Sequence, residues 1–323
     1  MNKIAIWLLA ACCAITFFFS AYYSFKVLRQ PASIAETPQT EDVDWARIAL
    51  ISTEINSSRW KQVLAGSQAV AQKYNMEIES LGTNRPNSDE LLKSMDMAVA
   101  AKVDGIIVQG LDSPQFNQRV SHALEKGIPV FTVITDAPSS LRRTFVGPDA
   151  LNEGHIIGNY IREHLHGKRV VGVVAGHQLT SSQIGRQKGL TDELAQDSKI
   201  AIYEAIPAES EIDAAKQETI NLLNKHPDVQ VIVGLTSEAG VGIQKAIVDR
   251  AQTGSFSIYT FDDSPDILQL VEDGVIQATL VHQPEKIGQT ALELMHRWLN
   301  NIDLPLNNHY FIPIKSIKEK GGQ

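Results

Sequence analysis

After residue 45, short runs of apolar, often β-branched residues alternate with longer amphipathic segments. Arg47–Ser52 is typical of a buried strand, and Ser58–Tyr74, with Trp60, Leu64 and Ala71 on one face, is typical of a helix. The same alternation continues to about residue 300. Strands that alternate with helices predict parallel sheets covered on both faces, so we expect an α/β protein.

The other expected elements fall into two groups along the chain. The strands are Met76–Leu81, Gly105–Val108 and Pro129–Val133, then Val170–Val174, Ile200–Glu204, Val229–Val233, Phe256–Phe261 and Gln277–Val281. The helices are Asp89–Ala101 and Pro114–Lys126, then Leu151–His166, Ser182–Ala195, Glu209–Asn224, Ala239–Val248, Pro265–Asp273 and Pro284–Asn300. Two such groups predict two doubly wound parallel-sheet lobes, and ligands of such sheets bind beyond the carboxyl ends of the strands.

The N-terminal residues differ in composition from the rest. No charged residue occurs from Ile4 to Phe25, and a helix of about 20 residues spans a bilayer. This pattern predicts an N-terminal membrane helix at residues 1–28, either an uncleaved anchor or a signal segment. Two alternatives stay open, because Leu9-Ala10-Ala11-Cys12 resembles a lipobox and a plain cleaved signal peptide also fits. All three place the rest of the chain on the extracytoplasmic side, after a polar linker at residues 29–45.

Charge and cysteine content exclude several classes of function. The net charge is −8, which argues against nucleic acid as a partner. Both cysteines, Cys12 and Cys13, lie in the N-terminal apolar run, so the folded part has no disulfide and no thiolate metal site. The sequence has no Walker loop, no nucleophile elbow and no zinc-protease motif. We therefore expect no enzyme, no cofactor and no metal.

Polar side chains follow several of the expected strands. The segment Thr53–Trp60 supplies hydrogen-bonding groups, a cation and an aromatic ring, and Arg186, Thr236, Asp262 and His282 follow later strands. Carboxylates and guanidinium groups can each engage two hydroxyls, and an indole covers the apolar face of a sugar ring. Structural roles remain open as well: a core position for Trp60, a surface ion pair for Arg186 and a helix cap for Asp262.

Several short motifs follow one another between about Arg47 and Lys315. They are Asp104-Gly105-Ile106-Ile107-Val108, Gly127-Ile128-Pro129-Val130, Thr135-Asp136-Ala137-Pro138, Arg186-Gln187-Lys188-Gly189-Leu190, Phe261-Asp262-Asp263-Ser264-Pro265 and Gln277-Ala278-Thr279-Leu280-Val281-His282-Gln283-Pro284. In this order they resemble the type I periplasmic binding proteins, in the ribose-binding-like branch of sugar ABC transporter substrate-binding proteins. Lactose-repressor-like regulators share this core, but here no DNA-binding helix-turn-helix precedes it.

The resemblance implies a set of ligand-binding residues. By position they are Thr53, Ser57, Arg59, Trp60, Arg186, Thr236, Asp262 and His282, and we add Asn56 and Glu238 as neighbours of these positions. Ile134 stands where a sugar-binding aspartate is common, so we expect Asp136 to supply that carboxylate. His282 stands where the family often has glutamine. These departures leave a sugar-like site but argue against ribose itself.

The resemblance also implies two lobes joined by three crossings, with a hinge that closes on the ligand. We expect the domain at residues 46–315, with one lobe at about 46–147 and 282–306, the other at about 148–281 and 307–315, and a tail at 316–323. The implied function is capture of a sugar or sugar-like polyol for delivery to an ABC transporter permease. One alternative is a membrane-anchored sensing subunit that signals to a histidine kinase, and a more remote one is a glycosidase using Asp262 and Asp263.

Overall fold

The structure is a computed structural model that describes residues 15–22, 45–84, 87–164, 169–176, 180–205 and 211–319. Residues 15–22 are helical and belong to the unit Met1–Asp44, whereas Trp45–Gln323 forms a separate compact unit. Among the described residues, no helix is both long and apolar enough to cross a membrane. The rest of the expected anchor and linker, residues 1–14 and 23–44, lies outside the described residues.

One six-stranded sheet of the compact unit has the order β11-β5-β4-β3-β1-β2. All its neighbouring strands pair in parallel, and in the centre Ile48 of β1 lies opposite both Ile78 and Gly105. The strands are β1 (Ala46–Ser52), β2 (Met76–Gly82), β3 (Gly105–Gln109), β4 (Val130–Val133), β5 (Thr144–Gly147) and β11 (His309–Phe311). The central strands are buried over most of their length, as parallel strands covered on both faces must be.

The second six-stranded sheet has the order β12-β10-β9-β8-β6-β7. Its strands are β6 (Arg169–Val174), β7 (Ile200–Ala205), β8 (Val231–Gly234), β9 (Ser257–Thr260), β10 (Ala278–Val281) and β12 (Ser316–Glu319). The strands β6 to β10 pair in parallel, and β12 pairs antiparallel with β10 at the edge. The expected α/β fold with two parallel sheets is confirmed, with one antiparallel edge strand added.

Each sheet carries helices on both faces. On the first sheet, α2 (Ser58–Ala71) and α10 (Pro284–Leu299) enclose one apolar core, and α3 (Ser88–Ala100) and α4 (Pro114–Glu125) enclose the other. On the second sheet the helices are α5 (Ala150–His164) and α6 (Ser181–Leu194) on one face, and α7 (Glu211–Lys225), α8 (Ser237–Asp249) and α9 (Pro265–Glu272) on the other. Each sheet with its helices is called a lobe below.

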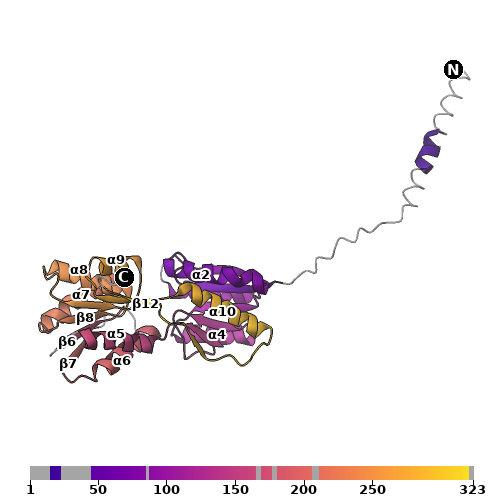
Figure 1. Cartoon of the computed structure of the whole chain (residues 1–323). Coiled ribbons are helices and arrows are strands. Elements are labelled where there is room, and N and C mark those ends of the chain that lie inside the picture. Colours follow the sequence, from indigo (N-terminus) through magenta and orange to yellow (C-terminus); the bar gives the residue numbers. More distant parts are fainter. Residues whose placement is uncertain are drawn as a thin grey trace, which may run out of the picture. The chain divides into compact units, whose positions relative to one another are not determined.

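Helices α2 and α10 lie side by side although they stand at opposite ends of the sequence (Figure 1). Glycines permit this close approach. A Cβ atom on Gly288 would lie 2.0 Å from the carbonyl oxygen of Val63, and one on Gly66 would lie 2.0 Å from that of Glu285. The contact places α10 in the first lobe, although the strand that precedes it belongs to the second.

The chain crosses between the lobes at three places. These are the segment from β5 to α5, the segment from β10 to α10, and the segment from β11 to β12. The third crossing differs from the expectation, since β11 pairs with β5 and so extends the first lobe to Phe311. The expected tail also contains β12, which completes the second sheet.

Candidate functional site

A cavity of about 540 Å³ is lined by residues of both lobes. Its walls come from the loops and helix starts that follow the carboxyl ends of the strands β1, β3, β4, β5, β6, β8, β9 and β10. This is where doubly wound sheets bind ligands, and the volume is within the range of small-molecule sites. A second cavity, of about 790 Å³, is lined by residues of the first lobe alone and by none of the expected ligand residues.

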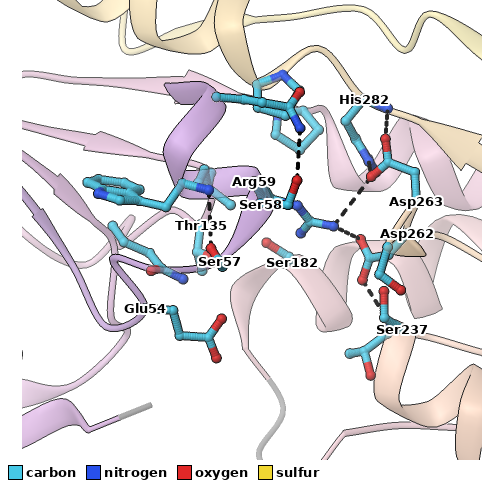
Figure 2. Close-up of a pocket in the computed structure, with 18 of the residues that line it drawn as sticks. Glu54, Ser57, Ser58, Arg59, Thr135, Ser182, Ser237, Asp262, Asp263 and His282 are labelled. Atoms are coloured by element: carbon cyan, nitrogen blue, oxygen red, sulfur yellow. Dashed lines mark hydrogen bonds and ion pairs between the residues drawn. The ribbon is translucent and has the colours of Figure 1, made fainter. Parts of the chain in front are cut away.

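The first-lobe wall is organised by the start of α2. Ser57 caps this helix, because its hydroxyl accepts a hydrogen bond from the Trp60 amide at 3.1 Å. The cap places Ser58 and Arg59 in the first turn, next to the cavity (Figure 2). Trp60 is also among the lining residues but is only 1% exposed, and its indole packs in the core between α2 and α10. Its structural role is therefore a core position.

The second-lobe wall contains a buried guanidinium group. Arg186 on α6 is 5% exposed. Its Nε donates to Glu153 at 2.9 Å, one terminal nitrogen donates to the Leu235 carbonyl at 2.8 Å, and the other donates to Asp262 at 3.1 Å. The guanidinium also lies over the ring of Phe261, 5.2 Å from its centroid. Arg186 is thus a buried hub of the site and not a surface ion pair.

Two adjacent carboxylates follow β9 and face the first lobe. Asp262 accepts a hydrogen bond from the amide of Ser237, at the start of α8, at 3.1 Å. Arg59 of the first lobe lies 3.2 Å from Asp262 Oδ1 and 3.6 Å from Asp263 Oδ1 (Figure 2). These two ion pairs join the lobes across the cavity. The N-cap of α9 is Ser264, so Asp262 does not have the capping role that the sequence left open.

His282 stands at the second crossing, between β10 and α10. Its Nε2 lies 2.5 Å from Glu153 Oε1 and its Nδ1 lies 3.4 Å from Asp263 Oδ1, while its backbone amide donates to Asp263 Oδ2 at 2.9 Å. Burial alone would lower the pKa of His282, but the hydrogen bonds to Asp263 and Glu153 raise that pKa to about 9. The imidazole is therefore a cation at neutral pH, with carboxylates at both ring nitrogens.

The carboxylates of the site divide into two groups. Burial alone would raise the pKa values of Glu153, Asp262 and Asp263, but neighbouring Arg186, Arg59 and His282 hold these pKa values below their usual range. Glu54 on the first-lobe wall is different. Burial and the negative charge of Glu238 raise the pKa of Glu54, and Arg59 opposes the shift only in part.

Eight of the eleven expected ligand residues line the cavity: Ser57, Arg59, Trp60, Arg186, Thr236, Glu238, Asp262 and His282. Thr236 also caps α8, since its hydroxyl accepts from the Ala239 amide at 3.1 Å. The three residues that do not line it are Thr53, Asn56 and Asp136.

The three outlying residues have partners within the first lobe. The Thr53 hydroxyl donates to Gln109 at 3.1 Å, and Asn56 donates to Asn84 at 2.6 Å. Asp136 forms an ion pair with Arg142, whose Nη2 lies 2.6 Å from Asp136 Oδ2. The carboxylate of Asp136 is thus directed into its own lobe and not to the cavity.

Other residues of the site were not predicted from the sequence. Glu54, Gln109 and Ser182 line the cavity, and they follow strands or start a helix like the residues that were predicted, so the same positional signal could have found them. Glu153, in the first turn of α5, was also missed, and it contacts both Arg186 and His282. Among the described residues, no group of three or more His, Cys, Asp or Glu side chains is arranged to hold a metal ion.

Comparison with known proteins identifies the family. Residues 48–302 match the family described as Periplasmic binding protein domain. The chain belongs to the periplasmic binding protein family. This confirms the resemblance found in the sequence motifs, and it explains the two sheets and the cavity between them.

Individual relatives agree with this assignment. The ribose import binding protein RbsB of Salmonella typhimurium is 26% identical over 256 residues, which are 78% of this chain and 84% of the relative. The crystal structure of GanP, a glucose-galactose binding protein from Geobacillus stearothermophilus, matches this structure with a TM-score of 0.79 and 29% sequence identity. The match covers 84% of this chain and 96% of the GanP chain.

A third similar structure is a complex. A chain of the XylFII–LytSN complex has a TM-score of 0.73 at 25% identity, covering 85% of this chain and 97% of its own. RbsB and GanP are both binding proteins according to their names. This chain is therefore a binding protein and not an enzyme, as its sequence predicted.

Proposed function

We propose that this chain is an extracytoplasmic solute-binding protein that captures a sugar or sugar-like polyol and delivers it to an ABC importer. The single observation that carries the proposal is the cavity lined from both lobes by charged and hydroxyl side chains. Two of the relatives reported above are named as a ribose binding protein and a glucose-galactose binding protein, which supports the same class of ligand.

The chemistry of the wall suits a hydroxyl-rich ligand. Arg59, Asp262 and Glu238 offer charged hydrogen-bonding groups, and each can engage two neighbouring hydroxyls. Arg59 and Arg186 are paired with Asp262, so these charges largely offset each other. Glu54 and Glu238 add carboxylates that can accept hydrogen bonds from hydroxyl groups. A neutral polyol is therefore a better match than an anionic sugar phosphate.

Capture by hinge closure follows from the position of the cavity. A ligand that contacts both lobes binds the closed arrangement more tightly than an open one, and this difference in affinity drives closure. Arg59 already contacts Asp262 and Asp263 of the opposite lobe. In the proposed cycle the ligand enters while this contact is open and is enclosed when it forms.

The N-terminal segment fits the same proposal. Residues 1–28 act as an anchor or a signal segment, and in either case the binding domain lies on the extracytoplasmic side of the cell membrane. Mass spectrometry of the protein isolated from membranes tests this. A chain that begins at Met1 supports the anchor, one that begins at a lipidated Cys12 supports a lipoprotein, and a soluble shortened chain supports a cleaved signal.

Titration calorimetry with D-ribose, D-allose, D-glucose and D-galactose tests the ligand class. We expect at least one of them to bind and the variant Asp262→Asn to bind it about 10 to 100 times more weakly, because a hydrogen bond to a charged group contributes about 1.5–3 kcal/mol. Asp192→Asn, an exposed carboxylate on α6, is the matched control. Absence of binding to a wider panel of pentoses, hexoses and inositols, or equal affinity in both variants, refutes the proposal.

A sensing subunit is the second candidate. The similar XylFII–LytSN complex shows that a protein with this fold assembles with a second, differently named protein. In the sensing version, ligand-induced closure acts on a histidine kinase and not on a permease. Affinity purification of the tagged chain from its native membrane separates the two candidates by whether an ABC permease or a sensor kinase is recovered in a ligand-dependent manner.

A further inference from the structure

Six charged side chains in the cavity region form a closed ring in which cations and carboxylates alternate. In order around the ring they are Arg59, Asp262, Arg186, Glu153, His282 and Asp263, and Asp263 returns to Arg59. Every neighbouring pair lies between 2.5 and 3.6 Å apart. We call this set the charge ring. Figure 2 shows its part around Arg59, Asp262, Asp263 and His282.

The ring is divided unequally between the lobes. Only Arg59 comes from the first lobe, on α2, whereas Asp262, Asp263, Arg186 and Glu153 stand on the second lobe and His282 stands at the crossing that follows β10. With His282 protonated, these five groups comprise two cations and three carboxylates. Arg59 supplies the cation that balances them, so the ring is neutral only when the lobes are in contact.

Glu153 has an unusual place in this ring. It is 1% exposed and is the one member that is not among the residues lining the cavity. Its Oε2 accepts from Arg186 Nε at 2.9 Å and its Oε1 lies 2.5 Å from His282 Nε2. Both of its oxygens are thus used to hold the two cations that in turn contact Asp262 and Asp263.

We propose that Glu153 is a positioning residue of the binding site, which fixes Arg186 and His282 and thereby presents Asp262 and Asp263 to Arg59 when the lobes close. The inference rests on the proposed function, since it concerns the same cavity. It adds a residue that does not line the cavity, and it identifies the charge ring as an ionic contact that couples the two lobes, beside the hydrogen bond from Ser181 to the Asp136 carbonyl.

The consequence of removing the Glu153 charge follows from the charges that remain. The substitution Glu153→Gln keeps the shape of the side chain but leaves Arg186 and His282 with only Asp262 and Asp263 as ionic partners. The second-lobe part of the ring would then be neutral and would attract Arg59 less. If His282 also loses its charge, the second-lobe part of the ring consists of one cation, Arg186, and two carboxylates, Asp262 and Asp263. Its net charge is then −1 again, as in the wild type, and it attracts Arg59 as before.

The first measurement is the pH titration of His282, which depends on the charged groups around its imidazole. Glu153 on α5 and Asp262 and Asp263 after β9 face its imidazole with negative charge, and Arg186 and Arg59 lie beyond these carboxylates. We expect the His282 imidazole, followed by NMR in the full chain, to titrate about one pH unit lower in Glu153→Gln, so that it still carries most of its proton at pH 7. This shift is a tenfold loss of proton affinity. Glu193→Gln, on α6 and paired with Arg162, is the control and should not shift it.

Lobe contact is the second measurement. Small-angle scattering of the ligand-free protein at pH 7 should give a larger radius of gyration for Glu153→Gln than for the wild type, approaching the value of Arg59→Gln. The double variant Glu153→Gln/His282→Gln should return toward the wild-type value. A purely structural role of Glu153 predicts that the double variant is at least as perturbed as the single one.

The outcomes separate this inference from the proposed function. If Glu153→Gln leaves the His282 titration and the radius of gyration unchanged, or if the double variant shows no recovery, the positioning role is wrong whether or not sugars bind. If both measurements change as expected but the wild type binds none of D-ribose, D-allose, D-glucose and D-galactose, the charge ring stands and the ligand class fails. Circular dichroism of each variant confirms that it is folded.

Discussion

His282 stabilises the folded chain more when it carries a proton than when it is neutral. Its imidazole lies between carboxylates of Glu153 and Asp263, and although burial opposes the charge, the hydrogen bonds to these residues raise the pKa of His282 from 6.5 to about 9. A group that binds its proton more tightly in the folded state contributes fully below the unfolded pKa, and this contribution is lost as the pH rises through the folded pKa. The free energy of unfolding should therefore fall between pH 6.5 and about pH 9.

The size of the effect follows from the two pKa values. One pKa unit corresponds to about 1.4 kcal/mol, so the shift from 6.5 to about 9 amounts to about 3 kcal/mol. The side chain of His282 is only 7% exposed, so solvent screens this interaction little. Such a loss is a large fraction of the net stability of a typical domain, which is about 5–15 kcal/mol.

Urea denaturation of the wild type and of His282→Gln at half-unit intervals from pH 6 to pH 10 measures this contribution. Other groups titrate in the same range, so the informative quantity is the difference between the two proteins. We expect the wild type to be more stable at pH 6 and the gap to narrow by about 3 kcal/mol by pH 10, with similar m-values. Parallel stability curves over the whole range would refute the assignment of a charged His282.

Two further predictions concern packing and the expected site residue that lies away from the cavity. Gly288→Ala should lower the midpoint of thermal unfolding, because the added Cβ atom would lie 2.0 Å from the Val63 carbonyl oxygen. Overpacking of this kind costs about 1–3 kcal/mol. An unchanged midpoint would contradict the close contact of α2 and α10. Asp136→Asn should destabilise the protein by weakening its ion pair with Arg142 while calorimetry shows unaltered sugar affinity. A tenfold loss of affinity would instead place Asp136 in the site.

The sequence predicts most of the fold because parallel sheets need continuous apolar strands between amphipathic helices. The expected strand Arg47–Ser52 corresponds to β1, and Pro284 marks the start of α10 as expected. The strands that the pattern missed are β5, β11 and β12. In β11 two of the three residues are exposed, so no apolar run marks it. Its place is set by pairing with β5, which the sequence pattern does not encode locally.

The site residues closest to strand ends were the most predictable. Arg59 follows β1 at the carboxyl edge of the first sheet, whereas Asp262 and His282 follow β9 and β10 at the carboxyl edge of the second, and both edges face the cavity. Glu153 lies in the first turn of α5, just after the first crossing between the lobes, and its contacts with Arg186 and His282 become visible only in the folded structure. Asp136 has the right position after β4, but Arg142 six residues later pairs with its carboxylate.

The packing of α2 against α10 has a consequence for how the protein is made. Ser67 on α2 donates a hydrogen bond to the carbonyl of Gly288, a contact that spans 221 residues, and β11 enters the first sheet later still. Contacts of such long sequence separation slow folding, because a large loop must close before they form. The first lobe therefore has no complete core until nearly the whole polypeptide has left the ribosome.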